Sequence, residues 1–227
     1  MSAPEHQGIR IGPSILSADF LHYGKSLQQA EEGNADYIHF DVMDGHFVPN
    51  ISIGFPLLEA TLRGTSLPVD VHLMIDNPDH WAPEFAAQGV AQVTFHAEAT
   101  KHAHRVAASI VEREAMAGIA INPATPLDMV EEMLPFISSL LVMTINPGFG
   151  GQELIPETVG KVRRARQLID TVNPACALQV DGGVAPDTIA MLHAAGADSF
   201  VAGSAVFNDE CDAAANIKAL RAAAMYR

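Results

Sequence analysis

The chain has 227 residues, of which 48% are hydrophobic, a length that suits one full-sized α/β domain rather than two. Its formal net charge of −14 excludes nucleic acid and anionic membranes as partners by simple repulsion. The first residues lack a signal peptide's apolar segment, and no stretch approaches the roughly 18 apolar residues of a membrane span, so we expect a cytoplasmic protein. Only Cys176 and Cys211 occur, and we expect two reduced, buried thiols.

Apolar runs rich in β-branched residues alternate with amphipathic stretches from end to end, which predicts parallel βαβ units without a linker between domains. Eight strands are expected, at residues 11–16, 37–43, 69–74, 90–96, 118–122, 140–145, 177–181 and 199–203. Helical patterns fill the gaps, for example at residues 19–32, 79–88, 103–114, 156–172 and 186–195. The chain is therefore predicted to be an α/β protein, a single-domain (β/α)8 TIM barrel over residues 1–227.

Nearly every predicted strand ends in residues able to do chemistry. They are Ser14, His39, Asp41, His72, His96, Asn122, Asn146, Asp181, Gly203 and Ser204. An open doubly wound sheet, the alternative architecture, would place its site at one crevice where the strand order reverses. A closed barrel brings all eight ends to one mouth, which is where such enzymes place the active site, so the barrel is favoured.

Two histidines and two aspartates form a candidate metal site. His39 and Asp41 are two residues apart on a strand, so both side chains point to the same face. His72 from the third strand and Asp181 from the seventh complete a set that suits Zn²⁺ or Fe²⁺, while Mn²⁺ and Co²⁺ also accept such ligands. Two buried carboxylates without a cation would repel each other and raise one pKa strongly, and a divalent ion removes that penalty.

The two aspartates also suggest a reaction. The second and seventh strands are three steps apart in an eight-stranded ring, so Asp41 and Asp181 approach a substrate from nearly opposite sides. Inverting a carbon next to a carbonyl requires one group to remove a proton from one face and another to return a proton to the other. A metal would stabilise the enediolate formed between the two steps.

Three glycine-rich turns follow the later strands, at residues 146–151, 181–183 and 202–204. Barrel enzymes characteristically bind phosphate with the last strands, and consecutive backbone N–H groups bind an anion without any lysine. The acidic composition therefore does not exclude a small phosphorylated sugar. We also expect residues 147–154 to form a lid over the substrate. Met43, Met74 and Met143 lie near strand ends, where they could exclude water from the reacting carbon or simply fill the core.

Seven motifs together resemble the ribulose-phosphate 3-epimerase family, in its order and over almost the whole chain. They are PSILSADF (13–20), HFDVMDGHFVPN (39–50), DVHLM (70–74), NPATP (122–126), MTINPGFGGQ (143–152), VDGG (180–183) and AGSAVF (202–207). The resemblance implies metal-dependent interconversion of D-ribulose 5-phosphate and D-xylulose 5-phosphate in the pentose phosphate pathway. The departures are small: Phe40 replaces a smaller aliphatic residue, and Glu153 and Leu154 occupy part of the lid.

The resemblance also implies roles for individual residues and a homo-oligomer as the assembled state. The metal ligands would be His39, Asp41, His72 and Asp181, with Asp41 and Asp181 as the catalytic acid/base pair. The residues implied to surround the substrate are Ser14, Met43, His72, Met74, Met143, Gly148, Phe149, Gly150, Gly151, Gly182, Gly183, Gly203 and Ser204.

Three alternative functions make different demands on the sequence. An epimerase of a related ketose phosphate, such as D-allulose 6-phosphate, would use the same metal and carboxylates and stays open. Decarboxylase or aldolase chemistry would need an Asp-x-Lys-x-x-Asp motif or a buried Schiff-base lysine, but Lys25, Lys101, Lys161 and Lys218 all fall in helical patterns. A non-catalytic binding module is expected to have lost one of the two carboxylates, and both are present.

Overall fold

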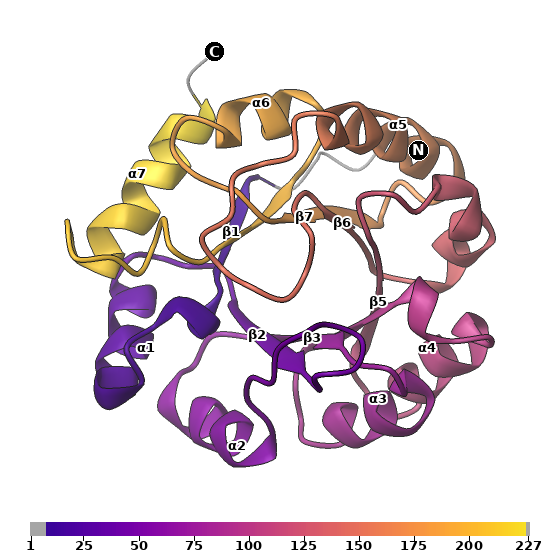
Figure 1. The fold of residues 1–227 in the computed structure, drawn as a ribbon, viewed down its shortest axis with the longest axis horizontal. Helices are drawn as coiled ribbons and strands as arrows, with labels where there is room; N and C mark the ends of the chain where they lie inside the picture. Colours follow the sequence, from indigo (N-terminus) through magenta and orange to yellow (C-terminus); the bar gives the residue numbers. More distant parts are fainter. Residues whose placement is uncertain (1–7, 226–227) are drawn as a thin grey trace.

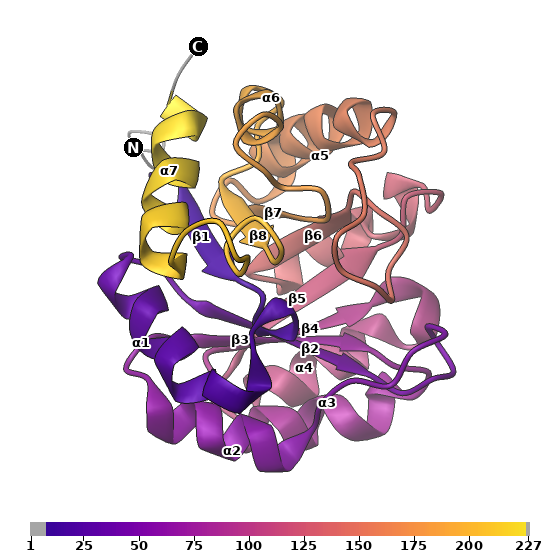
Figure 2. The same cartoon turned by 60° about the vertical axis from the view of Figure 1, so that its left-hand side comes forward.

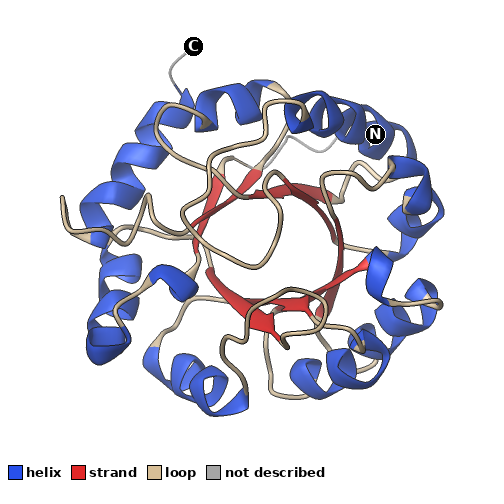
Figure 3. Cartoon of the chain, viewed as in Figure 1, coloured by secondary structure: helices blue, strands red, loops and turns tan. Residues whose placement is uncertain are grey.

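The computed structural model describes residues 8–225, and within that range eight parallel strands form a ring (Figures 1 and 3). The strands are β1 (Arg10–Pro13), β2 (Ile38–Met43), β3 (Val69–Met74), β4 (Gln92–His96), β5 (Met116–Ile121), β6 (Ser139–Met143), β7 (Ala177–Asp181) and β8 (Ser199–Ala202). Their hydrogen-bonded order is β1-β8-β7-β6-β5-β4-β3-β2, and a bridge between Ser14 and His39 joins the two ends. The predicted (β/α)8 barrel is confirmed.

The helices lie outside the ring of strands, as Figure 2 shows from a second direction. They are α1 (Tyr23–Glu32), α2 (Phe55–Gly64), α3 (Pro78–Ala86), α4 (Ala103–Val111), α5 (Thr158–Val172), α6 (Ile189–Ala194) and α7 (Ala213–Met225). Between β5 and β6 the chain forms two 3₁₀ segments, η4 (Leu127–Met129) and η5 (Glu131–Phe136), instead of an α-helix. Pro135 lies inside η5 and has no N–H to donate to a helical hydrogen bond, which disfavours a longer helix there.

Successive side chains along each strand point alternately toward the helices and toward the barrel axis, and these two sides differ in polarity. Phe40, Phe95 and Phe200 are fully buried in the apolar layer between the strands and the helices. Phe40 therefore points away from the barrel axis, as predicted, while its neighbours His39 and Asp41 point toward it. Most of the layer is Ile, Leu, Val and Ala, and burial of each large apolar side chain in it contributes about 1.5–3 kcal/mol.

A polar layer fills the barrel axis beneath the mouth. Asp70 accepts hydrogen bonds from the Nε2 atoms of Gln92 (3.0 Å) and Gln179 (2.8 Å). Gln179 Nε2 also donates to the hydroxyl of Tyr37 at 2.9 Å, and that hydroxyl lies 3.0 Å from Ser199 Oγ. Buried polar groups are tolerated when they are paired with one another, so this layer gives the strands a rigid polar floor.

Several predicted boundaries and environments were wrong. The helix expected at residues 19–32 begins as an α-helix only at Tyr23, because Asp19 caps a separate 3₁₀ turn by accepting from the N–H of Leu21. The helix expected at 186–195 begins at Ile189, after a turn in which the hydroxyl of Thr188 donates to the carbonyl of Gly183. Cys176 is buried as expected, but Cys211 is exposed.

Lys101 is also placed differently from its prediction, in a bend before α4 rather than in a helix. Among residues 8–225, the helices are all too short or too polar to cross a membrane.

Candidate active site

The four predicted metal ligands meet at the barrel mouth. One donor atom from each of His39, Asp41, His72 and Asp181 lies within 4.8 Å of the others. The first two come from β2, the third from β3 and the fourth from β7, so the closure of the ring brings the cluster together. Both histidines are fully buried, whereas the side chain of Asp181 is 16% exposed.

The distances between donor atoms fit a divalent cation. Asp41 Oδ1 lies 3.3 Å from His39 Nε2 and 3.1 Å from His72 Nδ1, and Asp181 Oδ2 lies 4.0 and 3.7 Å from the same two nitrogens. Ligands of a tetrahedral zinc ion with bonds near 2.1 Å are separated by about 3.4 Å. His39 Nε2 has no hydrogen-bond partner within the described part of the chain although it is buried. A bound cation would satisfy that nitrogen.

Residues on the axis hold the ring of His39 from behind. Its Nδ1 lies 3.2 Å from Asp70 Oδ2, a carboxylate that offers only acceptors. The proton of a neutral His39 therefore belongs on Nδ1, and Nε2 is left with a lone pair directed at the cluster. Carboxylate support of this kind is typical of metal-binding histidines.

The ring of His72 is held by a longer chain of side chains. Its Nε2 lies 3.0 Å from His96 Nε2, and His96 Nδ1 lies 3.2 Å from Glu98 Oε2. Glu98 Oε1 in turn accepts from the N–H of Asn122 at 2.7 Å and from the hydroxyl of Thr125. His96 and Asn122 were expected at the mouth, but neither lines the cavity there, and both act behind the cluster.

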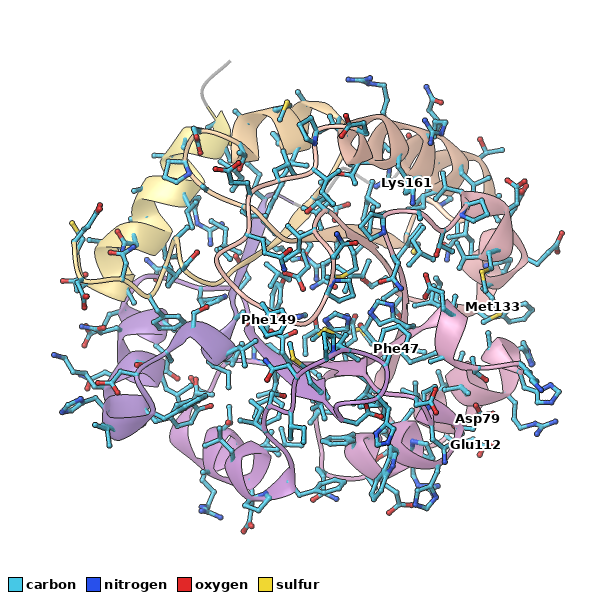
Figure 4. All side chains as sticks on the ribbon, in the orientation of Figure 1. Phe47, Asp79, Glu112, Met133, Phe149 and Lys161 are labelled. Carbon is cyan, nitrogen blue, oxygen red and sulfur yellow. The ribbon has the colours of Figure 1, made fainter. Side chains whose placement is uncertain are left out.

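Sequence reasoning missed Glu98 and Lys161. The ammonium group of Lys161, which belongs to α5 and is labelled in Figure 4, donates to the carbonyls of Asn122 (2.9 Å), Pro123 (2.6 Å) and Thr125 (2.6 Å). The buried residues of α5 include Thr158, Val159, Lys161, Val162, Ala165, Arg166 and Ile169. The helical spacing of this set places Lys161 on the apolar face of α5. Lys161 was assigned to a helix from its sequence pattern, without regard to which face of that helix it occupies.

The two aspartates have opposite shifts in pKa in the chain without a cation. Burial, followed by repulsion from Asp41, raises the pKa of Asp181 to about 7. Burial would also raise the pKa of Asp41, but without a cation Asp41 and Asp70 raise the pKa of His39 despite its burial, and the positive charge of that imidazole outweighs burial and holds the pKa of Asp41 below its usual range. The expectation that two buried carboxylates would push one pKa upward is confirmed. Burial also lowers the pKa of His72, which favours the neutral imidazole that binds a metal.

A cavity of about 780 Å³ opens directly above the cluster, a size typical of small-molecule sites. Asp41 and Asp181 line it, whereas His39 and His72 do not. The structure also brings the predicted substrate-binding residues to its wall, apart from His72. They are Ser14, Met43, Met74, Met143, Gly148, Phe149, Gly150, Gly151, Gly182, Gly183, Gly203 and Ser204. Ser14 Oγ donates to Asp41 Oδ2 at 2.5 Å, so this hydroxyl orients one of the two carboxylates.

The glycine-rich turns bring backbone to the cavity wall without side chains. Gly183 has a φ of +63°, and a Cβ there would lie 2.4 Å from the backbone nitrogen of Leu154. A Cβ on Gly203 would lie 2.6 Å from Ser17 Oγ. Among the described residues that line the cavity there is neither lysine nor arginine, so the donors this wall offers to an anion are backbone N–H groups and neutral side chains such as Ser17 and Ser204.

The expected lid residues lie across the mouth and contact a second loop. The side-chain amide of Asn50, in the loop after β2, donates to the carbonyl of Gly148 at 2.9 Å. Gln152 Nε2 donates to the carbonyls of Asn146 and Phe149, both at 2.8 Å, which folds the loop onto itself. Figure 4 shows Phe149 over the barrel opening and Phe47, from the loop after β2, at its rim.

Comparison with known proteins identifies the family. The model of the ribulose-phosphate 3 epimerase family matches residues 10–207. The chain belongs to this family. It is 49% identical over 214 residues to a ribulose-phosphate 3-epimerase of Mycobacterium tuberculosis, which covers 94% of this chain and 92% of the relative. It is 47% identical over 200 residues to the Escherichia coli (strain K12) protein of the same name, with 87% and 88% covered.

Membership of the ribulose-phosphate 3-epimerase family makes this chain an epimerase, and the resemblance drawn from its motifs is confirmed. A solved structure of KGPDC from Streptococcus mutans has the same fold, with a TM-score of 0.71 over 96% of this chain and 98% of that one. The two chains are only 14% identical, so this likeness concerns the barrel alone.

Proposed function

We propose that the chain interconverts D-ribulose 5-phosphate and D-xylulose 5-phosphate by metal-dependent epimerisation at carbon 3. The names of the curated relatives support the substrate. One structural observation supports the chemistry: two carboxylates from opposite parts of the ring, Asp41 and Asp181, face the cavity while the histidines lie behind them. The groups that would touch the sugar are therefore the two that can exchange protons.

In this mechanism one aspartate removes the proton from carbon 3 and the other returns a proton to the opposite face. The enediolate between these steps carries its negative charge on the two oxygens of the former hydroxyketone. The hydroxyl of Ser14 donates to Asp41 and holds this carboxylate in position. Asp181 faces the same cavity from β7 and is the second group that can exchange a proton. In the reverse direction the two residues exchange roles.

His39, Asp41, His72 and Asp181 would hold the metal, and their mixed nitrogen and oxygen donors suit Zn²⁺ or Fe²⁺, with Mn²⁺ and Co²⁺ also acceptable to the same donors. When bound, the cation supplies positive charge beside the oxygens on which negative charge develops. The unpartnered Nε2 of His39 supports this assignment, because a buried imidazole nitrogen without a partner is costly.

The phosphate would bind at the glycine-rich wall, where the turns after β7 and β8 face the loop of residues 148–151. Residues 147–154 would close over the sugar as a lid. Met43, Met74 and Met143 are buried at the base of the cavity, where they would keep water from the reacting carbon.

The test is proton NMR of D-ribulose 5-phosphate incubated with metal-loaded protein in D₂O, beside a sample treated with a chelator. Formation of xylulose 5-phosphate with deuterium at carbon 3, lost in the chelated sample, is the expected result. Turnover that survives complete metal removal would refute the role of the metal. A lack of both epimer and exchange would refute the substrate, and D-allulose 6-phosphate would be tested next with the same readout.

A further inference from the structure

We propose that Glu98 is a positioning residue that sets, through His96, the tautomer in which His72 offers a bare Nδ1 to the metal. This rests on the metal binding of the proposed function and extends it to a side chain that does not touch the cavity. The relay runs from the turn after β4 to the ligand on β3, through three side chains joined by two contacts of 3.2 and 3.0 Å.

Counting hydrogens along the relay gives its direction. A carboxylate only accepts, so Glu98 Oε2 takes the proton of His96 Nδ1. A neutral His96 then has only a lone pair on Nε2, which lies 3.0 Å from His72 Nε2. That contact needs one proton, so His72 carries it on Nε2. His72 Nδ1 lies 3.1 Å from the carboxylate oxygen Asp41 Oδ1, so the two protons of two neutral imidazoles serve three contacts. We assign the contact without a proton to Asp41, which already accepts from the hydroxyl of Ser14, and this leaves His72 Nδ1 unprotonated and facing the cluster.

The two imidazole ligands thus use opposite nitrogens for the same reason. His39 offers Nε2 because Asp70 takes its Nδ1 proton directly. His72 offers Nδ1 because Glu98 accepts the proton of His96 Nδ1, so that His96 Nε2 accepts the proton of His72 Nε2. All three histidine side chains have no exposed surface, so water does not compete for these contacts.

The orientation of Glu98 is itself fixed. Its Oε1 accepts from the N–H of Asn122 and the hydroxyl of Thr125, which leaves Oε2 for His96. The three donations from Lys161 hold the loop that carries those two donors. The carboxylate of Glu98 is therefore held in one orientation, with Oε1 toward the loop and Oε2 toward His96.

This clamp makes Glu98→Gln a sharp probe, because glutamine has nearly the same shape. Its carbonyl oxygen would stay with the two donors of Asn122 and Thr125, so its NH₂ group would face His96 Nδ1. His96 would then accept at Nδ1 and carry its proton on Nε2. The proton of His72 would move to Nδ1, where it blocks the metal.

The experiment reads the tautomers of metal-free protein by long-range ¹H–¹⁵N correlation NMR on ¹⁵N-labelled histidines. In the natural sequence we expect His72 protonated at Nε2 and His96 at Nδ1, and in Glu98→Gln the reverse at both rings. Zn²⁺ affinity, measured by competition with a chromophoric chelator, should fall about 10–100-fold in Glu98→Gln. Glu112→Gln, which removes one exposed carboxylate from the end of α4, should bind Zn²⁺ like the natural sequence.

Each failure has its own signature. A natural-sequence His72 protonated at Nδ1 overturns the relay even where Zn²⁺ binds and drives turnover, and this measurement does not depend on the variant folding. Unchanged Zn²⁺ affinity in a folded Glu98→Gln protein also overturns it. Natural-sequence protein that binds no Zn²⁺, Fe²⁺, Mn²⁺ or Co²⁺ refutes the proposed metal site, whichever tautomers the histidines show.

Discussion

Replacing Lys161 with methionine tests whether the loop behind the active site depends on one buried ammonium group. Methionine keeps the apolar stem on the buried face of α5 but removes donations to three carbonyls, at 2.9, 2.6 and 2.6 Å. Lys161 is only 6% exposed, and burial lowers its pKa, so the native charge is already held at some cost. Lys161→Met removes the cost of burying a charged ammonium group, but it leaves the three carbonyl oxygens without the donor that Lys161 provides.

The expected loss of stability follows from those acceptors. A buried acceptor left unsatisfied costs about 1–3 kcal/mol. Asn122, Pro123 and Thr125 are all partly exposed, so water reaches some of the three carbonyls. Counting one to two orphaned acceptors at the middle of that range, about 2 kcal/mol each, gives a loss of about 2–4 kcal/mol in the free energy of unfolding. With a urea dependence of about 2 kcal/mol per molar, the unfolding midpoint falls by about 1–2 M.

The assay is urea unfolding of metal-free protein followed by circular dichroism and by fluorescence, because coincident curves show whether a two-state treatment applies. Lys218→Met is the matched control, since Lys218 is exposed on α7 and the same substitution there should be nearly neutral. Equal midpoints for the two variants would refute the idea that Lys161 holds the loop.

Three further changes have distinct expected outcomes. Asp181→Asn should lower kcat by about 10²–10⁴-fold in an enzyme-linked assay, and full activity would exclude it as an acid/base group. Gly183→Ala places a side chain at a φ of +63° and in close contact with Leu154, at a cost of about 2 kcal/mol, so Tm should fall by about 4–8 °C. The control Gly160→Ala, inside α5, should raise Tm because alanine favours the helix. Burial raises the pKa of Glu98, but hydrogen bonds from His96, Asn122 and Thr125 outweigh it and depress the folded pKa from 4.5 to about 2. Its contribution is therefore complete above pH 4.5, and the advantage over Glu98→Gln in urea unfolding should shrink as pH falls toward 2.

The barrel and the four ligand candidates could be predicted because they depend on local rules. A polar pair two residues apart in an apolar strand, such as His39 and Asp41, must share a face, and parallel strands deliver their carboxyl ends to one mouth. The same rules place Phe40 among the helices. The (β/α)8 pattern implies a helix after every strand, but the connection between β5 and β6 forms two 3₁₀ segments, the second of which contains Pro135.

The supporting residues were harder to predict because their partners are distant in the sequence. Glu98 meets Asn122 across 24 residues, and Lys161 meets the same loop across as many as 39. Strand alternation says nothing of such contacts, which depend on how long side chains cross between neighbouring βα units. His96 was assigned to the mouth by its position at a strand end, but its ring turns toward His72, and the Nε2 atoms of the two rings lie 3.0 Å apart.

The barrel separates three tasks by depth, and this separation explains how a chain with a net charge of −14 can handle a phosphorylated sugar. In the relay we propose, polar residues on the axis fix the protons of the imidazoles, and Asp70 contacts His39 Nδ1 at 3.2 Å. The carboxylates Asp41 and Asp181 stand above the imidazoles and face the cavity. Under the proposed function, anion binding would fall to the glycine-rich rim, where backbone N–H groups act only at short range. Negative charge elsewhere on the surface is screened beyond about 10 Å, so local donors decide whether the phosphate binds.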